Sequence, residues 1–206
     1  DSGSQVEITV DSPDASLYYT LDGSDPRSGN NPSAAAVLYE RPITITENTV
    51  INVRARYEQS VWSSVITATY VTSIPALTIT EFMYNPPAAT PVEDPNDEFS
   101  TTNLEFIELK NVGAEEVQLT GVRFGRGVTF DFNAALVDTL GPGQAGVIVN
   151  EPAAFIARYG EDVLILGEYR GSLSNRAETI QLRGPLDQPI FEFRYDFAWY
   201  PLTNDQ

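Results

Sequence analysis

Residues 103–113 read Asn-Leu-Glu-Phe-Ile-Glu-Leu-Lys-Asn-Val-Gly, and this stretch decides the fold class. Its apolar residues follow one another almost without a break from Leu104 onward, which predicts a β-strand that an Asn and a Gly bring to an end. A second strand is predicted over residues 77–84, where an Asn-Pro-Pro sequence stops it. Two acids, Glu105 and Glu108, lie within the first strand, so the same stretch also raises the question of a catalytic site.

The composition favours a folded β protein. Hydrophobic residues make up 42% of the 206 residues, which is enough to fill a core. Val, Ile, Leu, Tyr and Phe are prominent among them, and these types suit the half-buried surface of a sheet. Fourteen Gly and fourteen Pro residues are spaced like the turns between short strands. The chain therefore predicts one large β-domain or two small ones.

The charge balance narrows the set of partners. Twenty-nine acids against twelve bases give a net charge of −17. Such a field repels phosphate backbones and anionic headgroups, so we expect neither nucleic acid nor a membrane surface as a partner. The sequence shows no run of 18 apolar residues, so membrane insertion is not expected either. An excess of acid is typical of a soluble extracellular protein or of one that meets divalent cations.

The sequence contains no Cys and no His. Disulfides, thiol nucleophiles, Cys/His zinc sites and a Ser-His-Asp triad are thereby excluded. We expect no catalytic residue and no cofactor-binding residue. Because the sequence starts within a few residues of its first predicted strand, we expect a mature product or a segment excised from a longer protein.

The first part of the chain predicts a small sandwich. Alternation of apolar and polar residues marks about five short strands, separated by turns at regular spacing. After the second of these, Asp22-Gly23-Ser24-Asp25-Pro26 forms a turn in which the Gly supplies a positive φ and the Asp side chains bind local amides. The short segment around Ser73 is the predicted boundary, which gives domains 1–73 and 74–206.

The second part predicts further strands and one helix. Residues 128–132 alternate as Val-Thr-Phe-Asp-Phe, which predicts a half-buried strand. The helix is expected over residues 152–159, with Asn150 or Glu151 near its N-cap, a Pro in its first turn and Gly160 after its end. A long acidic loop, residues 86–102, leads into the strand that opens at Leu104.

Several segments of the first domain carry a resemblance to a known family. They are Leu17-Tyr18-Tyr19-Thr20-Leu21-Asp22-Gly23-Ser24-Asp25-Pro26, Tyr39, Pro42-Ile43, Thr49-Val50-Ile51-Asn52-Val53-Arg54-Ala55, and the residues from Ser63-Ser64-Val65 to Tyr70. Residues 5–72 resemble in this way the C-terminal immunoglobulin-like domain of chitobiases and related hexosaminidases. The resemblance implies an accessory module of a secreted bacterial protein that carries no catalytic residues of its own.

The second domain carries its own series of motifs. They are Ile79-Thr80-Glu81-Phe82-Met83-Tyr84-Asn85-Pro86, Glu105-Phe106-Ile107-Glu108-Leu109-Lys110-Asn111, Leu119-Thr120-Gly121-Val122-Arg123-Phe124, Leu140-Gly141-Pro142-Gly143, Phe155, Tyr159-Gly160, Gly171-Ser172-Leu173-Ser174-Asn175, Glu178-Thr179-Ile180-Gln181-Leu182, Phe193-Arg194-Tyr195 and Trp199-Tyr200-Pro201. With these motifs in this order, residues 77–203 resemble a bacterial lamin-tail domain, which is an immunoglobulin-like sandwich.

This second resemblance implies an adhesion or scaffolding module of large surface and secreted proteins. In nuclear lamins the fold is linked to protein and chromatin contacts, and the acidic balance of this chain excludes the chromatin role. The family typically continues beyond the Trp-Tyr-Pro motif. We therefore expect the chain to be truncated at the C-terminal end of this domain.

The acidic loop holds the candidate metal site. Its densest group of oxygen ligands, which follows Glu93, consists of Asp94, Asn96, Asp97 and Glu98. The spacing from Asp94 to Glu105 resembles that between the first and last ligands of a calcium loop. Phe99 stands where such a loop needs a Gly and no helices flank it, so a solvated acidic loop is the alternative. Asp22 and Asp25 form a second calcium candidate, for which turn capping is the alternative.

Three acids on predicted strands are the candidates for acid chemistry: Glu81, Glu105 and Glu108. A glycosidase needs two carboxylates at a fixed separation in a cleft, and the sequence shows no sign of a cleft. The favoured interpretation is structural because an unpaired charge on a strand is costly. These acids are expected to cap nearby amides or to pair across strands with Lys110, Arg123 or Arg194.

Aromatic residues offer a third kind of site. A face for sugar stacking could be formed by Trp62, Trp199, Tyr18, Tyr19, Tyr84, Tyr169 and Tyr200. Aromatic side chains at alternating strand positions more often belong to the core, so core packing is the alternative interpretation.

The predicted fold is all-β, with two tandem immunoglobulin-like β-sandwiches. The predicted function is structural, as a non-catalytic adhesion or scaffolding segment of a larger secreted or cell-surface bacterial protein. The expected partners are other domains of the same polypeptide or surface proteins. A carbohydrate-binding accessory module of a secreted glycan-processing protein, with polysaccharide as its partner, is the alternative.

Overall fold

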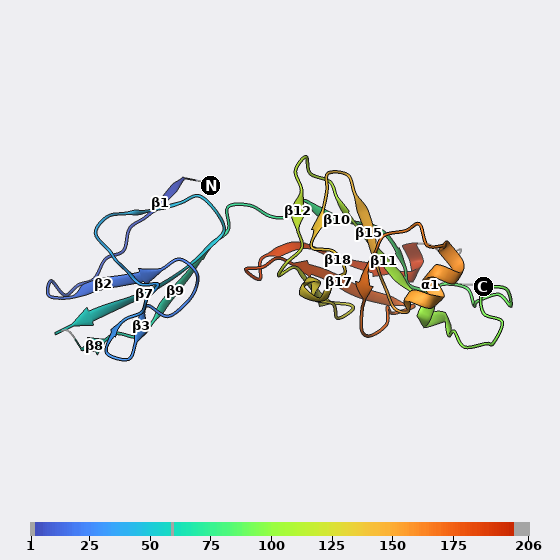
Figure 1. Ribbon diagram of the computed structural model, residues 1–206, viewed down its shortest axis with the longest axis horizontal. Coiled ribbons are helices and arrows are strands. Elements are labelled where there is room, and N and C mark those ends of the chain that lie inside the picture. The colour runs from blue at the N-terminus through green and yellow to red at the C-terminus, as the bar shows by residue number, and fades with distance from the viewer. Residues whose placement is uncertain (1–2, 59, 200–206) are drawn as a thin grey trace. The chain divides into compact units, whose positions relative to one another are not determined.

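A computed structural model of the chain describes residues 3–58 and 60–199 (Figure 1). The chain divides into two compact units, residues 1–74 and residues 75–206. Each unit has its own sheets and its own hydrophobic core. The all-β class predicted from the sequence is confirmed.

The first unit consists of short strands around one long strand. They are β1 (Ser4–Val6), β2 (Ser16–Thr20), β3 (Arg27–Ser28), β4 (Asn31–Pro32), β5 (Val37–Leu38), β6 (Ile43–Ile45), β7 (Thr49–Tyr57), β8 (Val61–Trp62) and β9 (Ile66–Tyr70). The main sheet has the order β5-β2-β7, and β8 and β9 both pair with the other edge of β7. Strands β1 and β6 form a second sheet, and β3 and β4 form a hairpin.

Alternation along β7 explains how the first unit builds its core. Ile51 is buried, and with Ile43 and Ile45 of β6 it forms the centre of the hydrophobic cluster. Half-buried side chains pack around this centre: Val6, Ile8, Tyr19, Tyr39, Val53 and Tyr70. The core thus lies between the main sheet and the β1–β6 sheet, as in a small sandwich.

The second unit is larger. Its strands are β10 (Leu77–Met83), β11 (Phe106–Asn111), β12 (Val117–Gln118), β13 (Arg123–Arg126), β14 (Thr139–Leu140), β15 (Ala145–Val149), β16 (Ile165–Glu168), β17 (Ala177–Arg183) and β18 (Pro189–Asp196). The helix α1 spans Pro152–Tyr159, and three 3-10 helices span Thr101–Leu104 (η1), Phe132–Ala134 (η2) and Phe197–Trp199 (η3).

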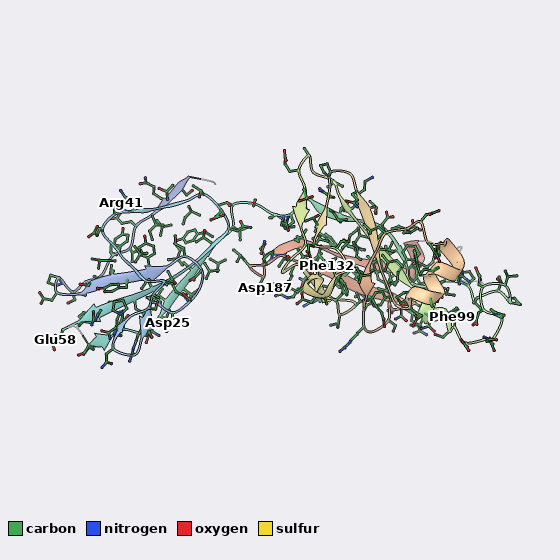
Figure 2. The ribbon with its side chains drawn as sticks, in the orientation of Figure 1. Asp25, Arg41, Glu58, Phe99, Phe132 and Asp187 are labelled. Carbon is green, nitrogen blue, oxygen red and sulfur yellow. The ribbon has the colours of Figure 1, made fainter. Side chains whose placement is uncertain are left out.

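Two sheets enclose the core of the second unit. One has the order β10-β11-β15-β16 and the other has the order β13-β17-β18, while β12 and β14 form a small ribbon. Strands β15 and β16 run parallel, with α1 in the connection between them, and the other pairs are antiparallel. Buried residues of both sheets, such as Ile107 and Ile180, meet in one cluster. Figure 2 shows Phe132 among these packed side chains.

The helix α1 forms where the sequence predicts it. Glu151 is its N-cap and accepts a hydrogen bond from the Ala153 amide at 3.2 Å, and Gly160, with φ 83°, ends it. Its residue Phe155 is buried and packs edge-on against Phe106 with ring centroids 5.3 Å apart. Burial of such a side chain contributes roughly 2–3 kcal/mol, which fixes the helix against the outer side of the first sheet. The described residues contain no helix with the length and apolar character needed to cross a membrane.

Two local predictions for the second unit are wrong. The strand of the opening stretch begins at Phe106, since residues up to Leu104 form the 3-10 helix η1. Residues 128–132 form only isolated bridges, and Phe132 begins the 3-10 helix η2. The alternating pattern arises because Phe130 and Phe132 both turn inward and pack edge-on, with ring centroids 4.8 Å apart.

Candidate functional site

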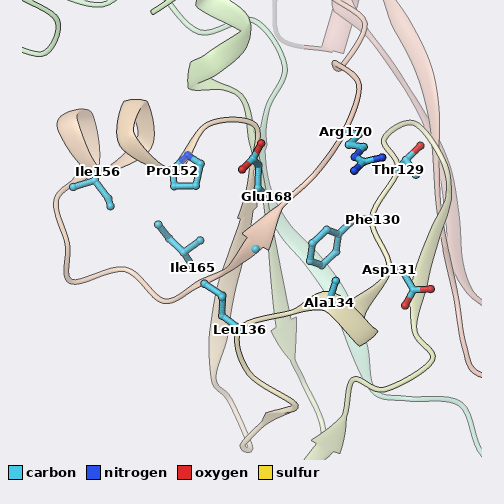
Figure 3. A pocket seen from close by; sticks show the side chains of 11 residues that line it. Thr129, Phe130, Asp131, Ala134, Leu136, Pro152, Ile156, Ile165, Glu168 and Arg170 are labelled. Carbon is cyan, nitrogen blue, oxygen red and sulfur yellow. The ribbon is translucent and has the colours of Figure 1, made fainter.

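A groove of about 650 Å³ lies beside α1 in the second unit. Its volume falls in the range of sites that bind ligands or side chains of a partner. Figure 3 shows Ile156 and Ile165 on one side of the groove, Phe130 facing them from the other, and Leu136 at its lower end. The remaining lining residues are Thr129, Asp131, Ala134, Pro152, Gly167, Glu168 and Arg170.

Three segments form the groove, and two of them, α1 and β16, follow one another closely in the sequence. The helix α1 brings Pro152 and Ile156, strand β16 brings Ile165, and residues 129–136 form the opposite wall. Backbone hydrogen bonds tie this wall to β16. The Leu136 amide donates to the carbonyl oxygen of Leu166 at 2.8 Å, and Thr129 and Arg170 exchange two bonds of 2.9 Å.

Gly167 is required on the floor of the groove. A Cβ atom at this position would lie 2.6 Å from Cζ of Phe130, closer than real Cβ contacts come. The Phe130 ring is buried, so it cannot move away without disturbing Phe132 beneath it. The absence of a side chain at Gly167 therefore lets the aromatic ring form part of the groove.

The rim of the groove carries both signs of charge. Asp131, Glu168 and Arg170 are exposed around the apolar floor. Leu136, at the same rim, is 74% exposed. An apolar floor with a polar rim is the usual composition of a surface that accepts a side chain of another polypeptide.

Glu105 of the opening stretch lies in the core and not in the groove. Only 3% of it is exposed, and its Oε2 accepts hydrogen bonds from the Leu173 amide at 2.7 Å and from the Tyr169 hydroxyl at 3.1 Å. Burial raises the pKa of Glu105 to about 7, and the charge of Glu178 adds to the rise. The side chain thus holds the segment at Leu173 against the start of β11, which is a structural role.

Of the two roles expected for the strand acids, amide capping is confirmed for Glu105, and the cross-strand ion pairs are wrong. Among the described residues, no ion pair joins Glu81, Glu105 or Glu108 to Lys110, Arg123 or Arg194. Glu105 instead caps an amide, and Glu108 accepts a hydrogen bond from the Thr80 hydroxyl. Arg123 pairs with Asp187 at the β17–β18 hairpin.

The acidic loop is fixed to α1 by a single arginine. Nε and Nη2 of Arg158 each lie 3.0 Å from an oxygen of Glu93, and its Nη atoms also donate to the carbonyl oxygens of Pro87 and Ala88. The bonds to Arg158 lower the pKa of Glu93 to about 2. Sequence inspection missed this clamp because its partners are separated by some 65 residues.

The calcium candidates lie in this loop. Asp94 is buried, and its Oδ2 accepts a hydrogen bond from the Phe99 amide at 2.6 Å. Backbone amides of Glu98 and Phe99 lower the pKa of Asp94. Asn96, Asp97 and Glu98 are exposed. Within residues 3–58 and 60–199, no three acidic side chains gather closely enough to hold a metal ion, and calcium binding by this loop stays a prediction.

Two family models match the chain. The model described as "Lamin Tail Domain" matches residues 71–193, more than half of the chain, and the model described as "Fn3 associated" matches residues 6–70.

The chain belongs to the lamin tail domain family.

The order of the matches confirms both resemblances, with the chitobiase-type domain first and the lamin tail domain second. Domains of both families are in general non-catalytic modules. No curated protein matches the chain. The groove, the Glu105 contacts and the Arg158 clamp all lie in the lamin tail unit.

In the Fn3-associated unit, the second calcium candidate forms a structured turn. Asp22 accepts a hydrogen bond from the Ser24 amide at 2.9 Å. Asp25 accepts one from the Arg27 amide at 2.9 Å and pairs with Arg54 at 2.7 Å, and the bond from Arg54 lowers the pKa of Asp25. Turn capping therefore accounts for the contacts of Asp22, and Asp25 combines turn capping with an ion pair to β7.

The aromatic candidates divide between core and surface. Tyr84 and Tyr169 are buried in the lamin tail unit, so for them the core interpretation is confirmed. Tyr18 and Trp62 are half-buried neighbours on the outer face of the main sheet in the Fn3-associated unit, with centroids 5.5 Å apart. Tyr200 and the side chain of Trp199 lie outside the described residues.

Proposed function

We propose that this chain is a non-catalytic structural segment of a larger secreted or cell-surface bacterial protein, and that its lamin tail unit contacts other proteins through the groove beside α1. The single observation that carries the proposal is the groove itself, in which an apolar floor around Phe130 meets a rim of mixed charge. Membership of two families of non-catalytic modules supports the structural role.

The chemistry of the groove favours a protein segment as its occupant. Leu136 and Ile156 offer apolar surface beside the buried Phe130 ring, and contiguous apolar surface of this kind is typical of contact sites. A partner that places an apolar side chain over Phe130 could direct a basic residue toward Glu168 and an acidic residue toward Arg170. Such rim charges set orientation and association rate more than affinity.

Photocrosslinking tests this proposal. A photoreactive phenylalanine analogue at position 136 in the native full-length protein should crosslink to one defined surface protein or to another domain of the same polypeptide. A matched probe at Val92, which is 92% exposed in the acidic loop, should not give that product. Reversal of both rim charges, Glu168→Arg with Arg170→Glu, should reduce the yield. If the probes at positions 136 and 92 give the same crosslinked products in equal yield, the groove is not the contact site.

The secreted or surface location needs its own test. An antibody against the lamin tail unit should label intact cells or the culture medium, whereas a signal confined to lysed cells would contradict the location. Turnover of chromogenic glycosides by the purified chain would contradict the non-catalytic role.

Carbohydrate binding is the second candidate function, and the Tyr18–Trp62 pair is the observation that favours it. The two rings are tilted by 53°, and the guanidinium carbon of Arg56 lies 5.4 Å from the Trp62 ring centroid. A tilted pair offers one stacking surface and not the coplanar row of a flat polysaccharide-binding face. Retention on insoluble polysaccharide that Trp62→Ala abolishes would support this candidate, and a chain that is not retained would contradict it.

A further inference from the structure

Among the described residues, hydrogen bonds close the lamin tail sandwich along one side, and no strand pairing closes it along the other. On the closed side, the two bonds between Thr129 and Arg170 join the two sheets. On the open side, β10 and β18 flank a second groove of about 300 Å³. Apolar side chains of both strands, among them Ile79, Phe82 and Phe193, form its walls.

The two sheets have four outer edges, and three of these are protected. The edge of β13 is covered by its own loop, since the Phe124 amide donates to the carbonyl oxygen of Phe130 at 2.9 Å. The edge of β16 is tied to residues 129–136. Strand β10 has a bulge between Ile79 and Glu81, which interrupts regular pairing. Strand β18 pairs only with β17 in the part of the chain that the structure describes.

The edge of β18 that faces away from β17 is regular over most of its length. Its single irregularity lies near its start, so residues 191–196 pair with β17 without interruption. The Phe197 amide donates to the carbonyl oxygen of Arg176 at 2.7 Å, so these two residues form a hydrogen-bonded pair. Hydrogen-bonded and non-hydrogen-bonded pairs alternate from there along β17 and β18. By this alternation, the amide and carbonyl groups of Glu192 and Arg194 point away from β17, and no other described strand pairs with them.

Several of the usual protections of an edge strand are absent from residues 191–196, whose charged side chains all lie on the outer face. Natural edges carry Lys, an inward-facing charge, a bulge or a Pro within the strand. Here the inward-facing side chains are Phe191, Phe193 and Tyr195, and the only Pro is the first residue, Pro189. Such an edge is suited to the addition of another strand.

We propose that β18 pairs antiparallel with β18 of a second copy of this chain, about a two-fold axis at Phe193. In this register Glu192 lies opposite Arg194 of the second copy, and Arg194 lies opposite Glu192 of the second copy. Both are hydrogen-bonded positions of the new ladder, because their backbone groups point toward the edge. Two opposite-charge pairs thus form on the outer face, and this self-complementarity favours a second copy over an unrelated strand.

Charge substitutions test the register. The wild-type chain should show a reversible monomer–dimer equilibrium in sedimentation velocity at about 0.15 M salt, where long-range repulsion between two chains of net charge −17 is screened. Arg194→Glu alone, or Glu192→Arg alone, places like charges opposite each other twice and should raise the dissociation constant about tenfold or more. The double variant restores both pairs and should dimerise within about threefold of the wild type.

A mixture of the two single variants gives the sharpest outcome. Each variant alone places like charges together, whereas a heterodimer of Arg194→Glu with Glu192→Arg contains only opposite-charge pairs. The mixture should therefore dimerise as tightly as the wild type. The matched control is Arg126→Glu, an equal charge change on β13 of the same sheet, which should leave the equilibrium unchanged.

Crosslinking checks the pairing directly, because the chain has no cysteine of its own. An equimolar mixture of Glu192→Cys and Arg194→Cys chains should form a disulfide-linked heterodimer faster than either chain forms a homodimer. A wild-type chain that stays monomeric at the highest concentration reached would overturn the proposal. So would a dimer that is indifferent to both single variants, Arg194→Glu and Glu192→Arg, since another surface would then hold it together.

Discussion

The substitution Glu105→Gln tests whether the acid of the opening stretch is held neutral in the folded lamin tail unit. The pKa of Glu105 is raised from an ordinary value of 4.5 to about 7, mainly because burial disfavours the carboxylate. The folded unit therefore binds a proton between these pH values, and the unfolded chain does not. Stability from this group is fully present below pH 4.5 and is lost as the pH rises through 7.

The magnitude follows from the two pKa values. A span from 4.5 to about 7, at about 1.4 kcal/mol for each pH unit, corresponds to about 3 kcal/mol of unfolding free energy. Gln has nearly the shape of the protonated acid and does not titrate. Its extra amide hydrogens add a cost beside the Leu173 amide, but this cost does not depend on pH.

The change with pH is therefore the quantity to measure. Relative to the wild type, Glu105→Gln should lose about 2–3 kcal/mol of unfolding free energy between pH 8 and pH 5, because the folded wild type gains a proton there. Urea unfolding read by hydrogen exchange of peptides from β11 and β17 reports the lamin tail unit separately from the other unit. The two units need not unfold in one transition.

A matched control separates this effect from the loss of one negative charge. Glu108→Gln removes an equal charge from β11, where the side chain is only half-buried and accepts a bond from Thr80. The difference in unfolding free energy between Glu108→Gln and the wild type should change much less between pH 5 and pH 8. If Glu105→Gln and the wild type differ by the same free energy at pH 5 and pH 8, the acid is not held neutral and the reasoning fails.

Three further predictions concern the groove and the acidic loop. Gly167→Ala brings a methyl group against the Phe130 ring and should lower the unfolding free energy by about 1–3 kcal/mol, measured by urea titration; an unchanged value would show that the ring gives way freely. Arg158→Met removes the clamp on Glu93, so limited proteolysis should cut residues 86–102 faster than in the wild type, and equal rates would contradict it. If residues 94–98 bind calcium, the Tm rises with added calcium and a chelator reverses the rise, whereas a constant Tm would disprove that prediction.

Local chemistry made α1 predictable and the opening strand only partly so. A Pro at the start and a Gly at the end are sufficient to define a helix of two turns, and both act within that segment. Ser100 and Asn103, by contrast, cap each other in η1, and the strand begins only after this turn is complete. The apolar run gave no sign of the turn because Leu104 is as buried as the strand residues that follow it.

The candidate site was less predictable because its parts meet only in the folded chain. The walls of the groove come from residues 129–136, from α1 and from β16, and their spacing depends on the parallel pairing of β15 with β16. Residues 128–132 show the alternation of a strand. This alternation reflects the rings of Phe130 and Phe132, which point inward, with Phe130 next to Gly167 of β16. No property of that segment alone signals the approach of Gly167.

The closure of the sandwich on one side accounts for both candidate surfaces. The bonds between Thr129 and Arg170 hold residues 129–136 beside β16, and this contact forms one wall of the groove. The same sheets present β10 and β18 at their opposite edges. Pairing through β18 would therefore leave the groove of each copy accessible, and a dimer would carry two equivalent grooves. A partner with repeated contact segments would then bind the dimer more tightly than the monomer through effective concentration alone. The single charge variants at β18 should reduce this gain in affinity, because they weaken the dimer, and they should leave the affinity of a single groove unchanged. The two surfaces can therefore be tested independently.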